Sequence, residues 1–124
     1  MEKDCIFCNI DKSKIIFGND SFIAMMDEFP VSKGHMLIIS RRHIENIFDL
    51  TMNEAESLQL MLIEVKKYLT MHYHPDGFNI GCNCGESAGQ TVMHFHMHVI
   101  PRYEGDVKNP RGGVRGVIPK KRNY

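Results

Sequence analysis

The chain has 124 residues, which is enough for one domain with a single packed core and no disulfide support. Its fifteen basic side chains equal its fifteen acidic ones, so net charge gives no argument for nucleic acid or an anionic membrane as a partner. No segment approaches the roughly 18 apolar residues of a membrane span, and the N-terminus lacks the apolar stretch of a secretory signal. We therefore expect a cytoplasmic protein whose four cysteines are reduced.

Two short apolar runs come first among the predicted elements. Residues 21–26 and 35–40 are rich in strand-forming side chains, and residues 30–34 supply the Pro, Ser and Gly of a turn between them. The two strands are close enough in sequence to pair as a hairpin. Residues 41–50 are interpreted as a short connector.

A long amphipathic helix is predicted over residues 51–73. Thr51 followed by Glu54 forms a capping box, which satisfies free amide groups at a helix start. Pro75 and Gly77 end the helix. One apolar face follows at helical spacing, and its members are Leu58, Met61, Leu62, Val65 and Leu69.

Two further strands are predicted at residues 78–82 and 92–101, with a Gly-, Ser- and Asn-rich loop between them. Two strands, a long helix and two more strands indicate an α+β fold. We expect an antiparallel sheet whose one face is covered by the helix and whose other face is free.

The last 23 residues, 102–124, resemble an extended tail of the single domain 1–124. They hold seven basic residues against two acidic ones, together with several glycines and prolines. We expect this basic tail to lie against a partner subunit or over the binding site.

Three histidines alternate along the last predicted strand. Side chains two apart on a strand share a face, so His94, His96 and His98 are expected to point the same way, and Met93, Phe95, Met97 and Val99 toward the helix. A neutral imidazole is a good nucleophile toward phosphorus, and its ordinary pKa keeps it largely neutral at cytosolic pH. Two other interpretations remain open: partly exposed surface residues, or ligands of a catalytic zinc.

Residues 90–102 resemble the motif of the histidine triad superfamily, His-φ-His-φ-His-φ-φ with φ apolar, at every position. The resemblance extends upstream through residues 34–39 and the region of Asp27. It implies that His96 attacks an α-phosphate to form a nucleotidyl-histidine that water then hydrolyses. It further implies supporting roles for His98 and His35, phosphate contacts from Asn83, Gln90 and Thr91, a ribose contact from Asp27, and an apolar base pocket near Phe7, Ile10 and Met25.

The pair Cys5 and Cys8 has the spacing of half a zinc site, but two ligands do not fill a tetrahedral shell. The resemblance implies a structural zinc completed by His43 and His94, and no catalytic cofactor. Two alternatives are unliganded thiols and an all-sulfur site that uses Cys82 and Cys84.

The family resemblance implies a nucleotide hydrolase or transferase. Dinucleoside polyphosphates such as diadenosine tetraphosphate are the favoured substrates, because the basic tail could meet the extra phosphates. Nucleoside phosphoramidates are an alternative, and so is a nucleotide-binding regulatory protein with incidental turnover. Similar family members also imply a homodimer whose sheets join edge to edge.

Overall fold

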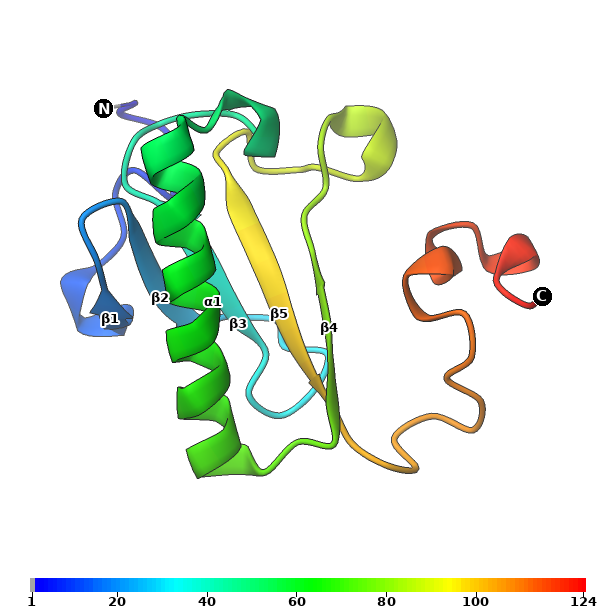
Figure 1. The fold of residues 1–124 in the computed structure, drawn as a ribbon. Helices are drawn as coiled ribbons and strands as arrows, with labels where there is room; N and C mark the ends of the chain where they lie inside the picture. Colours follow the sequence, from blue (N-terminus) through cyan, green and yellow to red (C-terminus); the bar gives the residue numbers. More distant parts are fainter. Residues whose placement is uncertain (1) are drawn as a thin grey trace.

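A computed structural model describes residues 2–124 and shows a sheet of five antiparallel strands with one long helix across one face (Figure 1). Along the sheet the strands follow the order β1 (Ile15–Gly18), β2 (Phe22–Met26), β3 (Met36–Ser40), β5 (His96–Arg102) and β4 (Gly77–Gly81). The α+β prediction is confirmed. Among the described residues, no helix combines the length and the apolar character that crossing a membrane would require. The long helix is α1 (Met52–Tyr73), which lies between β3 and β4 in the chain. Short 3-10 helices lie at Lys12–Lys14, Ile47–Asp49, Glu86–Ala88, Gly113–Val117 and Pro119–Lys121.

The predicted hairpin of β2 and β3 is confirmed, with Phe22 opposite Ser40 and Met26 opposite Met36. Strand β1 was missing from the prediction. It has only four residues at the edge of the sheet, and a one-residue register shift interrupts its pairing with β2. A short, half-exposed edge strand carries little alternation, which explains why the sequence pattern did not reveal it.

Helix α1 begins at the predicted capping box. The Thr51 hydroxyl accepts a hydrogen bond from the Glu54 amide, and the Glu54 carboxylate accepts one from the Thr51 amide. The helix ends where His74 adopts a left-handed conformation, just before Pro75. The predicted apolar face packs on the sheet, with Leu58, Met61, Val65 and Leu69 buried and Leu62 partly buried against the same core.

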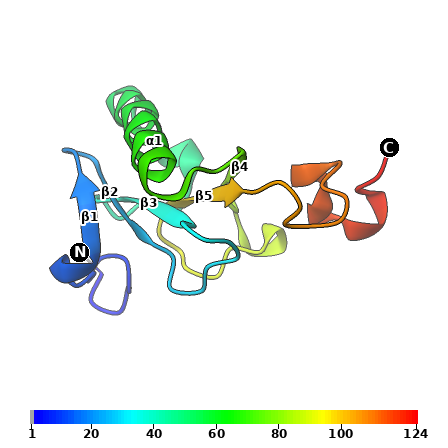
Figure 2. The same ribbon diagram turned by 90° about the horizontal axis from the view of Figure 1, so that it is seen from below.

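The opposite face of the sheet is not free, which corrects the prediction. A second apolar cluster lies there, formed by Ile23, Met25, Leu37 and Ile39. Phe7 and Ile10 of the N-terminal segment pack on that cluster, and this segment lies across the sheet from α1 (Figure 2). The capacity of the N-terminal segment to cover the sheet was not visible in its mixed polar and apolar sequence.

Strand β5 begins at His96 rather than at residue 92. The chain just before it leaves the regular ladder, since the Phe95 amide donates to the Ile44 carbonyl at 2.7 Å. The alternation holds within β5, where Met97 and Val99 are buried under α1, as is Phe95. Met93 was predicted to face the helix but is 38 % exposed.

The tail leaves the end of β5 and runs away from the sheet on the side of β4 (Figures 1 and 2). It is not fully extended, because it contains two short 3-10 helices. Arg115 donates to the carbonyls of Lys121 and Arg122, and Arg111 and Arg115 both lie over the Tyr124 ring. The last residues of the tail therefore fold back on themselves.

The start of α1 also carries an ion pair that the sequence did not reveal. The Arg42 guanidinium donates two hydrogen bonds to the Glu54 carboxylate, at 2.7 and 3.1 Å. Together with the Thr51 amide, Arg42 lowers the pKa of Glu54 from 4.5 to about 2. A carboxylate whose pKa falls on folding contributes stability above its unfolded pKa, and that stability is lost as the pH falls toward the folded value.

We therefore expect Glu54→Gln to lower the melting temperature by only about 2–4 °C at pH 7, because the Arg42 side chain is half exposed and water weakens the pair. The gap between the wild type and the variant should narrow as the pH falls from 4.5 toward 2. Thermal melts followed by circular dichroism measure it. Glu64→Gln, which breaks only an exposed pair with Lys67, is the control and should change little. A gap that stays constant down to pH 2.5 would contradict the role of the Glu54 charge.

Candidate functional site

A cavity of about 850 Å³ opens on the face of the sheet opposite α1. The N-terminal segment, the ends of β2 and β3, strand β5 and the loop after β4 surround it. All the residues predicted from sequence for catalysis or substrate binding line this cavity except Gln90, and so do the three residues predicted for the base pocket. The lining includes His35, His96, His98, Asp27, Asn83 and Thr91, and the apolar Phe7, Ile10, Met25, Phe29, Val31 and Leu37.

His96 is the first residue of β5, and its ring is fixed by a backbone contact. Its Nδ1 lies 2.9 Å from the carbonyl oxygen of His94. A carbonyl only accepts hydrogen bonds, so the Nδ1 of His96 carries the hydrogen and donates it. In the neutral ring the Nε2 then holds a free lone pair. The Phe7 ring packs against the imidazole in a T-shaped arrangement, with 4.9 Å between the two ring centroids.

His98 is paired with the buried His35, which the loop between β2 and β3 carries at its end. The Val31 amide donates to Nδ1 of His35 at 3.1 Å, so the hydrogen of the neutral His35 ring is on Nε2. That Nε2 lies 2.9 Å from Nδ1 of His98 and donates to it. The neutral His98 ring consequently has its hydrogen on Nε2. His98 is therefore a hydrogen-bond donor on the cavity face.

Burial favours the neutral form of both rings. It lowers the pKa of His35, and the negative charge of Asp27 only partly offsets this. It also lowers the pKa of His98, with His35 and His96 adding to the effect. At neutral pH the pair therefore stays uncharged, which keeps the tautomers described above in place.

Asp27 comes directly after β2 and anchors the loop that follows. Its Oδ1 accepts a hydrogen bond from the Phe29 amide at 2.8 Å. Its Oδ2 lies 3.3 Å from Nε2 of His35 and 3.6 Å from Nδ1 of His98. The Nε2 hydrogen of His35 is donated to the nearer atom, Nδ1 of His98. Oδ2 of Asp27 is therefore free to accept a hydrogen bond from a group in the cavity.

Gln90 does not face the cavity, unlike the adjacent Thr91. Its buried side chain accepts a hydrogen bond from the Gly85 amide and donates to the carbonyls of Glu45 and Val92. Both ends of the amide are thus occupied, and Gln90 holds the loop of residues 85–90 closed. The side chain of Gln90 therefore has no free hydrogen-bonding group for the predicted contact with phosphate.

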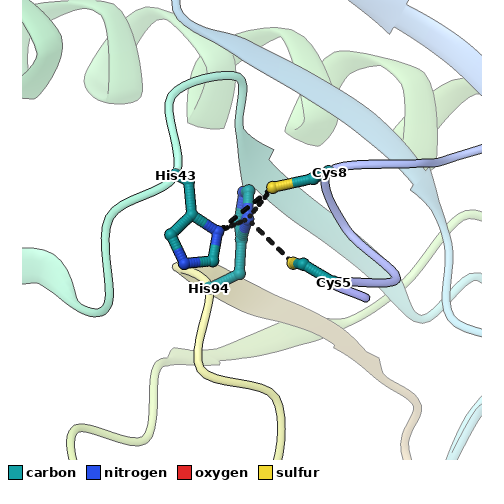
Figure 3. Close-up of side chains that lie close together, drawn as sticks. All are labelled: Cys5, Cys8, His43 and His94. Carbon is teal, nitrogen blue, oxygen red and sulfur yellow. Dashed lines mark hydrogen bonds between the residues drawn. The ribbon is translucent and has the colours of Figure 1, made fainter. Parts of the chain in front are cut away.

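A second cluster of side chains lies beside the cavity, and its four members come from three separate segments (Figure 3). Cys5 and Cys8 are in the N-terminal segment, His43 follows β3, and His94 precedes β5. The two sulfur atoms lie 3.3 and 3.4 Å from Nδ1 of His94, and Nδ1 of His43 lies 3.1 Å from both Nδ1 of His94 and the sulfur of Cys8.

The chemistry of these donors fits a tetrahedral metal ion. Nε2 of His94 donates to the Ser40 carbonyl at 2.7 Å, so its Nδ1 has a lone pair that points into the cluster. Ligands of a zinc ion at 2.0–2.3 Å lie about 3.3–3.6 Å from one another when they are nitrogen–nitrogen or nitrogen–sulfur pairs. The observed separations are within a few tenths of an ångström of this. The predicted set of four ligands is therefore brought together.

Two alternative metal sites are not favoured. Cys82 and Cys84 lie beyond β4 and are not part of this cluster. Within residues 2–124, no group of metal-type ligands joins the three triad histidines to one another. Asp27, His35 and His98 do converge, but the hydrogen that Nε2 of His35 carries makes that group a hydrogen-bonded network.

Comparison with known proteins gives consistent matches. The family described as the HIT domain matches residues 9–105. "Protein hit" of Bacillus subtilis is 37% identical over 109 residues, which cover 84% of this chain and 75% of that protein. Bis(5'-adenosyl)-triphosphatase of Dictyostelium discoideum is 34% identical over 100 residues, which cover 81% of this chain and 67% of that protein.

Solved structures agree with the fold. A zinc-bound histidine triad family protein from Mycobacterium smegmatis superposes with a TM-score of 0.76 at 30% identity, covering 86% of this chain and 80% of that one.

Proposed function

This chain belongs to the histidine triad (HIT) family, and from that premise we propose that it is a nucleotide hydrolase or transferase that attacks an α-phosphate with His96. The observation that carries the proposal is the hydrogen bond from Nδ1 of His96 to the carbonyl of His94. In the neutral ring this bond leaves the free lone pair on Nε2, beside the cavity. A nucleophile needs a free lone pair at the reacting atom, and this contact supplies it without a neighbouring base.

The proposed reaction has two steps. Nε2 of His96 forms a bond to the α-phosphorus, and the bond between that phosphorus and the leaving-group oxygen breaks. The Nε2 hydrogen of His98 is positioned to hydrogen-bond a phosphate oxygen as charge develops there. Water then attacks the phosphorus, the nitrogen–phosphorus bond breaks, and a nucleoside monophosphate leaves. His35 acts through His98 by fixing its tautomer.

The rest of the cavity suits a nucleotide. Asn83 and Thr91 supply polar groups for phosphate oxygens, and the free Oδ2 of Asp27 suits the hydroxyl groups of a ribose. Phe7, Ile10 and Met25 form an apolar wall for the base. Gln90 contributes by holding the loop that carries Asn83 and Thr91 at its ends.

Dinucleoside polyphosphates are the substrates we favour. The name of the Dictyostelium relative describes an enzyme that acts on such a compound. A basic tail suits the added phosphates, yet no residue of the tail lines the cavity of its own chain. The tail would therefore act on the cavity of a partner subunit. Nucleoside phosphoramidates, and a regulatory role with slow turnover, are the competing functions.

We further propose a homodimer in which two sheets join at β4. This strand is an edge of the sheet, it contains two glycines, and Ile80 is 46 % exposed. An uncovered edge presents unpaired backbone groups that a second copy can pair with. The tail leaves the fold on this same side.

The cluster of Cys5, Cys8, His43 and His94 is proposed to hold one structural zinc. The ion would tie the N-terminal segment to the sheet, and so hold Phe7 against His96. Its four protein ligands leave no position for substrate, so it would stabilise the fold and not take part in the reaction. The thiolate ligands require a reducing compartment, which supports a cytoplasmic location.

The zinc proposal predicts that Cys8→Ser lowers both the metal content and the melting temperature. Elemental analysis and thermal melts measure these, and Cys84→Ser, outside the cluster, is the matched control that should keep its zinc. X-ray absorption of the wild-type protein should show two sulfur and two nitrogen neighbours. Four sulfur neighbours, or nitrogen alone, would contradict the assignment.

The nucleophile proposal predicts that His96→Ala reduces turnover of diadenosine tetraphosphate by at least about a thousandfold while AMP still binds. Chromatographic assays and calorimetry separate the two effects. His72→Ala is the control, because His72 is exposed on α1 and far from the cavity lining. Turnover of His96→Ala close to that of the wild type would eliminate the mechanism.

The position of attack predicts the products. Diadenosine tetraphosphate should give AMP and ATP, because the bond broken is at an α-phosphorus. In ¹⁸O-labelled water the label should appear in AMP only, since water attacks the phosphorus held by His96. Formation of two ADP molecules, or label in ATP, would show that attack occurs elsewhere.

A further inference from the structure

Two cysteines flank a residue of the cavity. Cys82 and Cys84 come directly after β4, are both partly buried, and have their sulfur atoms 4.0 Å apart without a disulfide. Cys82 packs against the core beneath α1. Asn83 lies between the two cysteines and lines the cavity on the opposite face of the sheet.

Both ends of this three-residue segment are held in place. On one side, Gly81 is paired with His98 in the ladder of β4 and β5. On the other side, the Gly85 amide donates to the side chain of Gln90 at 2.8 Å, and the Gly85 carbonyl accepts from the Gln90 amide at 3.1 Å. A strain applied between the cysteines must therefore be absorbed by residues 82–84.

A disulfide between the two cysteines would apply such a strain. The two sulfur atoms lie 4.0 Å apart and would have to approach to about 2.05 Å. Closing this gap of about 2 Å would draw Cys82 and Cys84 together and bend the backbone at Asn83 between them. The side chain of Asn83 would then turn away from its place in the cavity.

We propose that Cys82 and Cys84 form a reversible dithiol site, whose oxidation to a disulfide displaces Asn83 and weakens nucleotide binding. The first half of the proposal stands on the sulfur geometry alone. The second half rests on the proposed function, in which Asn83 holds a phosphate oxygen. No other pair of cysteines in the chain is available for this, since Cys5 and Cys8 belong to the metal cluster.

The oxidant is a low-molecular-weight disulfide such as glutathione disulfide. Burial raises the pKa of Cys82 to about 11, and the adjacent Cys84 adds to the rise, so Cys82 is a thiol at neutral pH. Cys84 attacks first, as its thiolate, forming a mixed disulfide and releasing one glutathione thiolate. Cys82 then loses its proton and attacks the sulfur of Cys84, which forms the internal disulfide and releases the second glutathione.

Peptide mapping tests the first half. Trypsin cleaves after Lys67 and Arg102, and the peptide 68–102 between these sites contains Cys82 and Cys84 and no other cysteine. Zinc-loaded protein is equilibrated in glutathione buffers, alkylated and digested. We expect this peptide to escape alkylation and to weigh two hydrogen atoms less after oxidation, and to be alkylated twice after reduction. A peptide that is still alkylated twice where a dithiothreitol standard is fully oxidised would overturn the proposal.

Calorimetry with AMP tests the second half. Hydrogen bonds to charged groups correspond to about tenfold to hundredfold in affinity, so we expect oxidised protein to bind AMP weaker by that factor and a phosphine reductant to restore binding. Cys84→Ser, which cannot form the disulfide, should bind AMP equally before and after treatment. Reduced protein that fails to bind AMP would refute the proposed function instead.

The ¹⁵N resonance of the Asn83 side-chain amide gives a readout that does not depend on AMP. It should shift on oxidation of the wild type and stay in place in Cys84→Ser. A disulfide that forms without moving this resonance or changing AMP affinity would overturn the link to Asn83.

Discussion

The backbone carbonyl of His94 accepts a hydrogen bond from the ring of His96, and the proposed chemistry of the site depends on this contact. In the proposed reaction, it determines which nitrogen of His96 is free to attack. The carbonyl is itself held in place, because the imidazole of His94 is buried between the Ser40 carbonyl and the two thiols. A metal ion in that cluster would thus orient the nucleophile through one residue, without touching the nucleophile or the substrate. The proposed structural metal site and the proposed catalytic site would then share one short segment of chain.

Strand β5 makes this arrangement possible by separating two environments. Met97 and Val99 pack beneath α1, and His96 and His98 face the cavity from the same strand. The packed side gives the reactive side a rigid support, which a nucleophile needs if its ring is to keep one orientation. On the cavity side, each imidazole tautomer is fixed by a hydrogen-bond partner. The Val31 amide fixes the tautomer of His35, and His35 fixes that of His98.

The features that could be predicted from sequence are those that repeat along the chain. The spacing of apolar residues gave α1 and its core face, alternation gave the two sides of β5, and Thr51 with Glu54 gave the start of the helix. The family resemblance suggested the four residues of the metal cluster, which come from distant segments. Features that depend on a single tertiary contact were missed. The family resemblance implied a phosphate contact for Gln90, yet its side chain bonds backbone groups of Gly85 and Val92 nearby in the loop and of the distant Glu45. The same holds for the ion pair of Arg42 with Glu54.

The central claim is that the His94 carbonyl leaves Nε2 of His96 as a free lone pair. Long-range ¹H–¹⁵N spectra of the histidine rings in zinc-loaded protein at neutral pH measure this directly, because protonated and unprotonated ring nitrogens have well-separated shifts. The account predicts that Nδ1 of His96 carries a hydrogen and that Nε2 does not, with a change confined to Nε2 when a nucleotide substrate is added. A hydrogen on Nε2 of His96 in the free protein would contradict it.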